Sequence, residues 1–134
     1  MEIKISAQIK APLEKVWDYW TQGEHITGWN FASDDWHCPD SKIDLRPGGE
    51  FHSTMAAKDG SFSFDFWGTY TEIIPNKKIR SMMGDGRKLD VFFEVQEGGV
   101  LVTEIFEAEN QNSIELQRQG WQAILDNFKK YCEK

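Results

Sequence analysis

The stretch "SFSFDFWGTYTEIIPNKKI", residues 61–79, combines a strand, a turn and the start of a second strand, and it decides the fold. Aromatic side chains recur at every second position, so they share one side of the first strand: Phe62, Phe64, Phe66 and Tyr70. Gly68 takes the place in this row where another large side chain is expected, and we interpret it as a bend or bulge. The row is either an ordinary filled core or the wall of a pocket that holds a ligand.

Strand and turn patterns extend in both directions from this stretch. Alternating or apolar runs predict strands near residues 2–10, 42–46, 50–57, 62–74, 78–83, 87–96 and 100–108. Connections such as "RPGG", "KDG", "IPNK", "GDG" and "EGG" are short and rich in turn residues, so the middle of the chain is predicted to be an antiparallel meander. "DDWHCPD", residues 34–40, is interpreted as a solvated loop, and its mixed side chains match no metal-ligand spacing.

Helical patterns flank the meander. Pro12 is suited to the first position of a helix, and a second short helix or a turn covers about residues 24–30. A long helix is predicted over residues 113–132, with Asn112 as its N-cap and Glu115 completing a capping box. Its apolar positions recur at helical spacing: Ile114, Trp121, Ile124, Leu125, Phe128 and Cys132. The predicted fold class is therefore α+β, with one curved antiparallel sheet and a long helix packed against one face.

Composition and charge restrict the class of partner. The 134 residues fit one domain, residues 1–134, and the formal net charge is -7. An acidic surface repels phosphate groups, so we expect no nucleic-acid partner, and no apolar run is long enough for membrane insertion. The N-terminal residues do not resemble a secretion signal, and Cys38 and Cys132 are far apart, so we expect reduced thiols and a cytoplasmic location. We expect no cofactor and no metal, because the common motifs for such sites are missing, and the protein is either a monomer or a homodimer.

Four segments together resemble a known superfamily: "IKAPLEKVWDYWTQGEHITGW", "DLRPGGEF", "FWGTYTEIIPNKKI" and the "GW" of the C-terminal helix. They are similar to the START-like, Bet-v-type superfamily (SRPBCC), and within it to the proteins named after the activator of the heat-shock-protein-90 ATPase. The resemblance extends from residue 1 to about residue 131. It implies a helix-grip fold, in which a seven-stranded antiparallel sheet grips the C-terminal helix and two short helices follow the first strand. It also implies an apolar cavity between helix and sheet, where members of the superfamily bind lipids, hormones or polyketides.

The predicted ligand-binding residues are those expected to face this cavity. The resemblance places its mouth near Trp29, Phe31 and Trp36, and alternation along the strands brings further side chains to the inner face. The full predicted set is Trp29, Phe31, Trp36, Phe51, Met55, Phe64, Phe66, Phe93, Glu104, Gln117, Trp121 and Leu125. Aromatic rings and a flexible methionine suit a flat or greasy apolar ligand, whereas the alternative is that the same side chains simply fill the space.

Glu104 interrupts an apolar row in the last predicted strand, "VLVTEIFEAE". One phase of this strand turns Glu104 inward beside Val102 and Phe106. The other phase turns Thr103 inward and leaves the carboxylate in water, and we favour the first. Desolvation would raise the pKa of an inward Glu104, which makes it a weak candidate for a general acid. Alternatively, Glu104 pairs with Arg87 or a tyrosine hydroxyl for structural reasons.

Two residues of the long helix depart from its apolar stripe. Gln117 is polar, and Gly120 lies in mid-helix, where glycine costs about 1 kcal/mol relative to alanine. Either tight packing against the sheet or room for a ligand accounts for Gly120, and we favour tight packing.

Three classes of function remain. The favoured one is a small-molecule binding protein, which predicts an enclosed apolar cavity of at least about 300 Å³ between sheet and helix. The second is a cyclase or hydratase-type enzyme that uses the same cavity, although no acid–base pair is identifiable. The third is a co-chaperone-like protein related to the ATPase activator. We expect this chain to lack the additional N-terminal domain of that co-chaperone, which weakens the third class.

Overall fold

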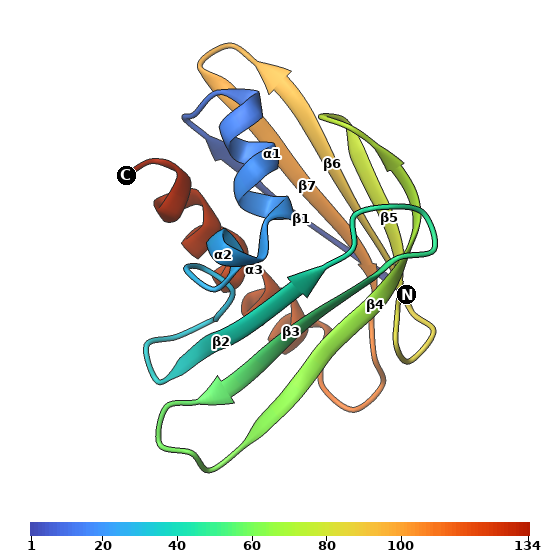
Figure 1. Cartoon of the computed structure of the whole chain (residues 1–134). Coiled ribbons are helices and arrows are strands. Elements are labelled where there is room, and N and C mark those ends of the chain that lie inside the picture. The colour runs from blue at the N-terminus through green and yellow to red at the C-terminus, as the bar shows by residue number, and fades with distance from the viewer.

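The computed structural model describes all residues, 1–134 (Figure 1). The elements in chain order are β1 (Glu2–Ile9), α1 (Leu13–Thr21), α2 (Gly23–Ile26), β2 (Trp36–Ile43), β3 (Glu50–Ala57), β4 (Ser63–Ile74), β5 (Lys78–Met83), β6 (Lys88–Gln96), β7 (Gly99–Glu107) and α3 (Ile114–Cys132). The strands form one curled sheet, and the three helices lie on its inner side (Figure 1). This is the α+β helix-grip arrangement that the sequence and the resemblance predict.

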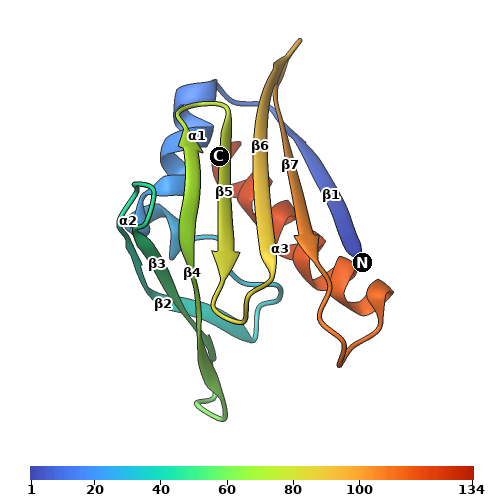
Figure 2. The same ribbon diagram turned by 90° about the vertical axis from the view of Figure 1, so that its right-hand side faces the viewer.

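The sheet has seven strands in the order β1-β7-β6-β5-β4-β3-β2, and every neighbouring pair is antiparallel. Strands β2 to β7 form a meander, because short connections join antiparallel neighbours. β1 and β2 are the two edges, so the segment that holds α1 and α2 runs from one edge to the other. In the turned view α3 lies behind β6, β7 and β1, within the hollow of the sheet (Figure 2).

The core lies between the sheet and the helices. Nineteen buried hydrophobic residues form one cluster, to which the sheet, α1 and α3 all contribute. Cys38 and Cys132 are buried free thiols. No helix of the chain combines the length and the apolar character that crossing a membrane requires.

The N-terminus of α3 differs from the prediction by one residue. Ser113 is the N-cap, and its side chain accepts a hydrogen bond from the Leu116 N–H. The prediction that Asn112 caps the helix is wrong, because both its backbone N–H and its side-chain amide donate to the Glu109 carboxylate. The cap therefore comes from the next polar side chain along the chain.

The strand predicted over residues 42–46 is wrong in its position, because β2 spans Trp36–Ile43. Much of the segment predicted to be a solvated loop is therefore an edge strand. Its pairing with β3 shifts register between His37 and Asp40, and Pro39 lies inside this irregularity. A proline is tolerated there because an edge strand at a bulge does not need every N–H for pairing.

Gly68 is explained by a close approach, and the interpretation of this glycine as a bulge is wrong. It lies opposite Phe51 in the β3–β4 ladder. A Cβ at this position would lie 2.7 Å from the Phe51 ring and 2.6 Å from the Met82 carbonyl oxygen. The register shift of β4 occurs further along, between Tyr70 and Glu72. The Phe51 ring therefore covers the gap that Gly68 leaves in the aromatic row.

Candidate ligand cavity

A cavity of about 430 Å³ lies between the inner face of the sheet and α3. Twenty-four residues line it, and 15 of them are hydrophobic. The volume exceeds the predicted minimum of about 300 Å³, but the cavity is open to the surface and not enclosed as predicted. Phe64 and Leu116 belong to the lining but are 46% and 56% exposed, so the cavity reaches the surface near the first turns of α3.

Eight of the twelve predicted ligand-binding residues lie together around this cavity. They come from the segment after α2, from three strands and from α3: Trp29, Phe51, Met55, Phe64, Phe66, Glu104, Gln117 and Trp121. The resemblance placed Trp29 at the cavity, whereas strand alternation and helical spacing placed the other seven side chains on the inner surface. Their role in binding a ligand stays a prediction.

Two of the remaining predicted residues are part of the filled core. Leu125 is completely buried on α3, and Phe93 is 6% exposed on β6. The Phe93 ring meets Trp17 of α1 edge-on, with ring centroids 5.1 Å apart. Helix α1 thus fills the space in front of Phe93. Neither Phe93 nor Leu125 lines the cavity.

The other two predicted residues lie toward the edge strand. Trp36 begins β2 and packs against Phe62 and Phe64, with ring centroids 6.2 Å apart in each pair. Phe31 lies in the segment before β2, and its carbonyl oxygen accepts a hydrogen bond from the Asn127 side chain. Neither Phe31 nor Trp36 lines the cavity. Of the three residues that the resemblance placed at the cavity mouth, only Trp29 lines the cavity.

The aromatic row of β4 is divided between the interior and the solvent. Tyr70 is buried, whereas Phe62 is 59% exposed at the start of the row. Phe66 reaches α3 directly, because its ring meets Trp121 edge-on at a centroid distance of 5.9 Å. Trp121 in turn stacks on Phe106 of β7, with centroids 3.9 Å apart and planes 14° apart. These contacts fix the Trp121 ring as one rigid part of the cavity wall.

Glu104 is the only carboxylate deep inside this lining. The favoured phase of β7 is confirmed, since Val102, Glu104 and Phe106 are all buried and Glu104 is 5% exposed. No hydrogen bond or ion pair within the chain reaches its carboxyl group, and burial raises the pKa of Glu104 to about 8. The suggested pairing with Arg87 or a tyrosine is wrong, because the partners of Arg87 lie elsewhere. At neutral pH the Glu104 side chain is therefore predominantly a neutral acid that faces the cavity.

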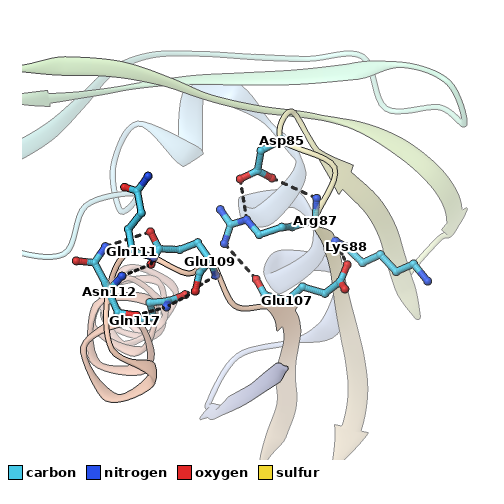
Figure 3. A network of polar contacts seen from close by, with 8 residues as sticks. All are labelled: Asp85, Arg87, Lys88, Glu107, Glu109, Gln111, Asn112 and Gln117. Carbon is cyan, nitrogen blue, oxygen red and sulfur yellow. Dashed lines mark hydrogen bonds and ion pairs between the residues drawn. The ribbon is translucent and has the colours of Figure 1, made fainter.

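Gln117 lines one end of the cavity, and its side-chain hydrogen bonds join α3 to the segment that follows β7, which we call the Gln117 staple (Figure 3). Its side-chain oxygen accepts a hydrogen bond from the Glu109 N–H at 2.9 Å. Its side-chain nitrogen donates to the carbonyl oxygens of Glu109 and Asn112, at 3.0 and 2.9 Å. Both amide hydrogens are thus used within the protein. This network explains why a polar side chain lies buried on α3.

Arg87 is held by the protein beside the same end of the cavity (Figure 3). Its guanidinium donates to the Asp85 carboxylate at 2.7 Å and to the Glu107 carbonyl oxygen at 3.1 Å. The Glu107 carboxylate accepts a hydrogen bond from the Lys88 N–H. The β5–β6 turn and the end of β7 are therefore tied together by polar contacts. Arg87 contributes its charge to the cavity but has protein partners of its own.

Gly120 lines the cavity, and a Cβ there would meet no atom within 4 Å. The favoured explanation of this glycine, tight packing against the sheet, is therefore wrong. The space beside Gly120 is part of the cavity itself.

Sequence reasoning missed polar residues of the lining, among them Asn30 and Ser81. Ser81 is 5% exposed, and its hydroxyl donates to the Leu89 carbonyl oxygen at 3.0 Å. In "KIRSMM" this serine lies between Ile79 and Met83 on the buried face, so it interrupts an apolar row as Glu104 does. That signal could have identified Ser81. Asn30 follows α2 in an irregular segment, and no periodicity marks it.

A curved antiparallel sheet around a long C-terminal helix, with an apolar cavity between them, defines the START-like helix-grip class. The family model described as "Activator of Hsp90 ATPase homolog 1-like protein" matches residues 10–133. The chain therefore belongs to the family of Activator of Hsp90 ATPase homolog 1-like proteins. No curated protein matches the sequence.

Solved structures of related proteins have the same fold. The chain is similar to the AHSA1-like protein from Aeromonas hydrophila, with a TM-score of 0.92 and 46% identity over 98% of this chain and 91% of that one. A protein from Cytophaga hutchinsonii gives a TM-score of 0.85 and 45% identity over 97% of this chain and 90% of that one. A protein from Nitrosomonas europaea has a TM-score of 0.83 at 19% identity, over 98% of this chain and 93% of that one, which shows the fold alone.

Proposed function

We propose that this protein binds an apolar small molecule in the cavity between the sheet and α3. The observation that carries the proposal is a space of about 430 Å³ between the sheet and α3 that is lined mainly by apolar side chains. Unfilled apolar space costs stability, because the side chains around it lose their contacts. A bound apolar molecule would restore these contacts.

The lining indicates the shape of the ligand. Seven aromatic side chains surround the space: Trp20, Trp29, Phe51, Phe64, Phe66, Tyr70 and Trp121. Their flat faces favour a molecule that contains a ring system, and Met55 can adapt its shape to different ligands. The half-exposed Phe64 and Leu116 provide the route by which such a molecule enters from solvent.

Titration with a neutral apolar fluorophore, N-phenyl-1-naphthylamine, tests this proposal. The wild-type protein should increase its fluorescence to saturation. Gly120→Leu should greatly weaken this response, because the new side chain occupies the cavity, whereas Gly120→Ala adds one methyl group to open space and should retain it. If Gly120→Leu binds the fluorophore as tightly as the wild type does, binding occurs elsewhere and the proposal fails.

Catalysis in the same cavity is a second candidate, favoured by the state of Glu104. An acid with a pKa of about 8, buried in an apolar site, can donate a proton at neutral pH. For any bound compound that the protein converts, Glu104→Gln should abolish turnover while binding is retained. Unchanged turnover in this variant would remove Glu104 from the mechanism.

A chaperone partner is a third candidate, and it rests on the family name, which refers to activation of the Hsp90 ATPase. A direct assay of Hsp90 ATPase activity with saturating amounts of this protein tests it. Stimulation would support the chaperone role, and unchanged ATPase activity would exclude this form of it.

A further inference from the structure

Among the carboxyl and guanidinium side chains that line the cavity, Glu104 alone lacks a partner within the protein. The other two are Arg87 and Glu109. The Arg87 guanidinium is bonded to the Asp85 carboxylate and the Glu107 carbonyl oxygen. The Glu109 carboxylate accepts hydrogen bonds from the backbone and side chain of Asn112. A charged group on a ligand would therefore find its available counterpart at Glu104.

The surroundings of Glu104 favour a cation over an anion. The faces of aromatic rings attract positive charge, and seven aromatic residues line this space. An anionic ligand would find no free cationic partner in the lining, because the Arg87 guanidinium is already bonded to Asp85 and Glu107. The formal net charge of -7 acts in the same direction, because it raises the local concentration of cations and lowers that of anions.

We propose that the ligand of this cavity is an amine, with an apolar ring or chain body among the aromatic side chains and one protonated amino group that pairs with Glu104. This inference rests on the proposed function, since it specifies the ligand of the same cavity. Burial favours the neutral form of the Glu104 carboxyl group, so the ionic pair forms when this group loses its proton to the solvent. The ammonium group keeps its own proton, and one proton is thus released for each amine bound near neutral pH.

Other titratable groups around the cavity do not account for such a release. Apart from Glu104, the lining contains Tyr70, Arg87 and Glu109. Burial raises the pKa of Tyr70, so this hydroxyl stays protonated at neutral pH. The Arg87 guanidinium and the Glu109 carboxylate are both engaged in hydrogen bonds within the protein. The segment of α3 that lines the cavity, from Leu116 to Ile124, contributes no titratable side chain to the lining.

Three probes that share one naphthalene ring system test the inference: 1-naphthylmethylamine, 1-naphthylmethanol and 1-naphthoate, which carry a positive, a neutral and a negative group. Calorimetric titration of the full chain at pH 7 should give an affinity for the amine at least about 10-fold above that for the alcohol, with the carboxylate weakest. Repeating the amine titration in two buffers of different ionisation enthalpy should reveal the released proton.

Two Glu→Gln variants of equal net charge separate the cavity from the acidic surface. Glu104→Gln should reduce amine affinity to that of the alcohol and abolish proton release, whereas Glu94→Gln, at an exposed position of β6, should change neither. Alcohol binding as tight as amine binding in the wild type would overturn the inference and leave the proposed function intact. An unchanged amine affinity in Glu104→Gln would also overturn it. If none of the three probes binds, the proposed function fails as well.

Discussion

Glu104 lies directly opposite Val91 in the ladder between β7 and β6, so a carboxyl group and an apolar side chain share one wall of the cavity. On its other side Glu104 pairs in register with Ile5 of β1. Neither neighbour can hydrogen-bond to the carboxyl group through its side chain. This apolar position in the sheet is the reason for the raised pKa of Glu104.

The stability of the protein should depend on pH through Glu104. Below about pH 4.5 the group is protonated in both the folded and the unfolded chain and contributes nothing. Between pH 4.5 and about 8 the unfolded chain loses the proton while the folded one retains it, so stability falls as pH rises. Each pKa unit corresponds to about 1.4 kcal/mol, so the loss by pH 8 is on the order of 5 kcal/mol.

Urea denaturation of the wild type and Glu104→Gln across this range measures the effect. The difference in unfolding free energy should change with pH in favour of the glutamine variant, whose amide does not titrate. Glu94→Gln serves as the control and should show a constant difference from the wild type. A constant difference for Glu104→Gln as well would show that Glu104 titrates normally in the folded protein.

Two glycines should respond oppositely to alanine substitution. Gly120→Ala should stabilise the protein by up to about 1 kcal/mol, because a methyl group meets open space and alanine is the better helix former. Gly68→Ala should destabilise it by roughly 1 to 3 kcal/mol, because the methyl group would overlap the Phe51 ring and the Met82 carbonyl oxygen. Thermal denaturation of both variants checks the pair. Stabilisation by Gly68→Ala would contradict the close approach of Phe51.

Removing the Gln117 staple should loosen the connection between β7 and α3. Gln117→Ala loses three hydrogen bonds and leaves partly buried backbone groups of Glu109 without their partner, at an expected cost of about 1 to 3 kcal/mol in unfolding free energy. Hydrogen exchange at the Glu109 N–H should become faster. Gln119→Ala, on the exposed side of the same helix, is the control and should leave both quantities nearly unchanged.

His52 on the outer face of the sheet should titrate above its ordinary range. Its ring lies between the carboxylates of Glu50 and Asp65, at 2.8 and 2.7 Å, and stacks on Trp67. Hydrogen bonds to both carboxylates raise the pKa of His52. NMR titration should show the pKa falling in Asp65→Asn and staying the same in Asp59→Asn, an exposed turn residue. If Asp65→Asn leaves the pKa unchanged, the pairing is absent in solution.

The fold was predictable because its central strands and its long helix each have a regular spacing of apolar residues. Alternation in β7 and in the row from Phe62 to Tyr70 identified central strands, and helical spacing identified α3. The position of β2 was not predicted correctly. As an edge strand it pairs on one side only, so it tolerates Pro39 and an irregular register, and these obscure the alternation of apolar residues. The sequence showed that Gly68 interrupts the aromatic row, but the reason for this glycine, the Phe51 ring packed against it, required the structure.

The candidate site was predictable only in part, because periodicity places a side chain on a face and does not tell filled core from empty space. Trp121 and Leu125 lie one helical turn apart on the same stripe of α3, yet the first lines the cavity and the second is completely buried. Phe93 has the same alternation as the lining residues Leu89 and Val91 of β6, but α1 covers it. Whether a side chain lines the cavity or belongs to the filled core depends on how the helices pack against the sheet.

Binding of an apolar ligand between the sheet and α3 should be visible at the six tryptophan indole N–H groups. In ¹H–¹⁵N NMR spectra recorded during titration with neutral 1-naphthylmethanol, the lining tryptophans should shift and the others should not. The lining set is Trp20, Trp29 and Trp121, and the set outside it is Trp17, Trp36 and Trp67. Saturable shifts confined to the first set are the predicted result. Shifts confined to the second set, or no saturable shift at all, would contradict the account.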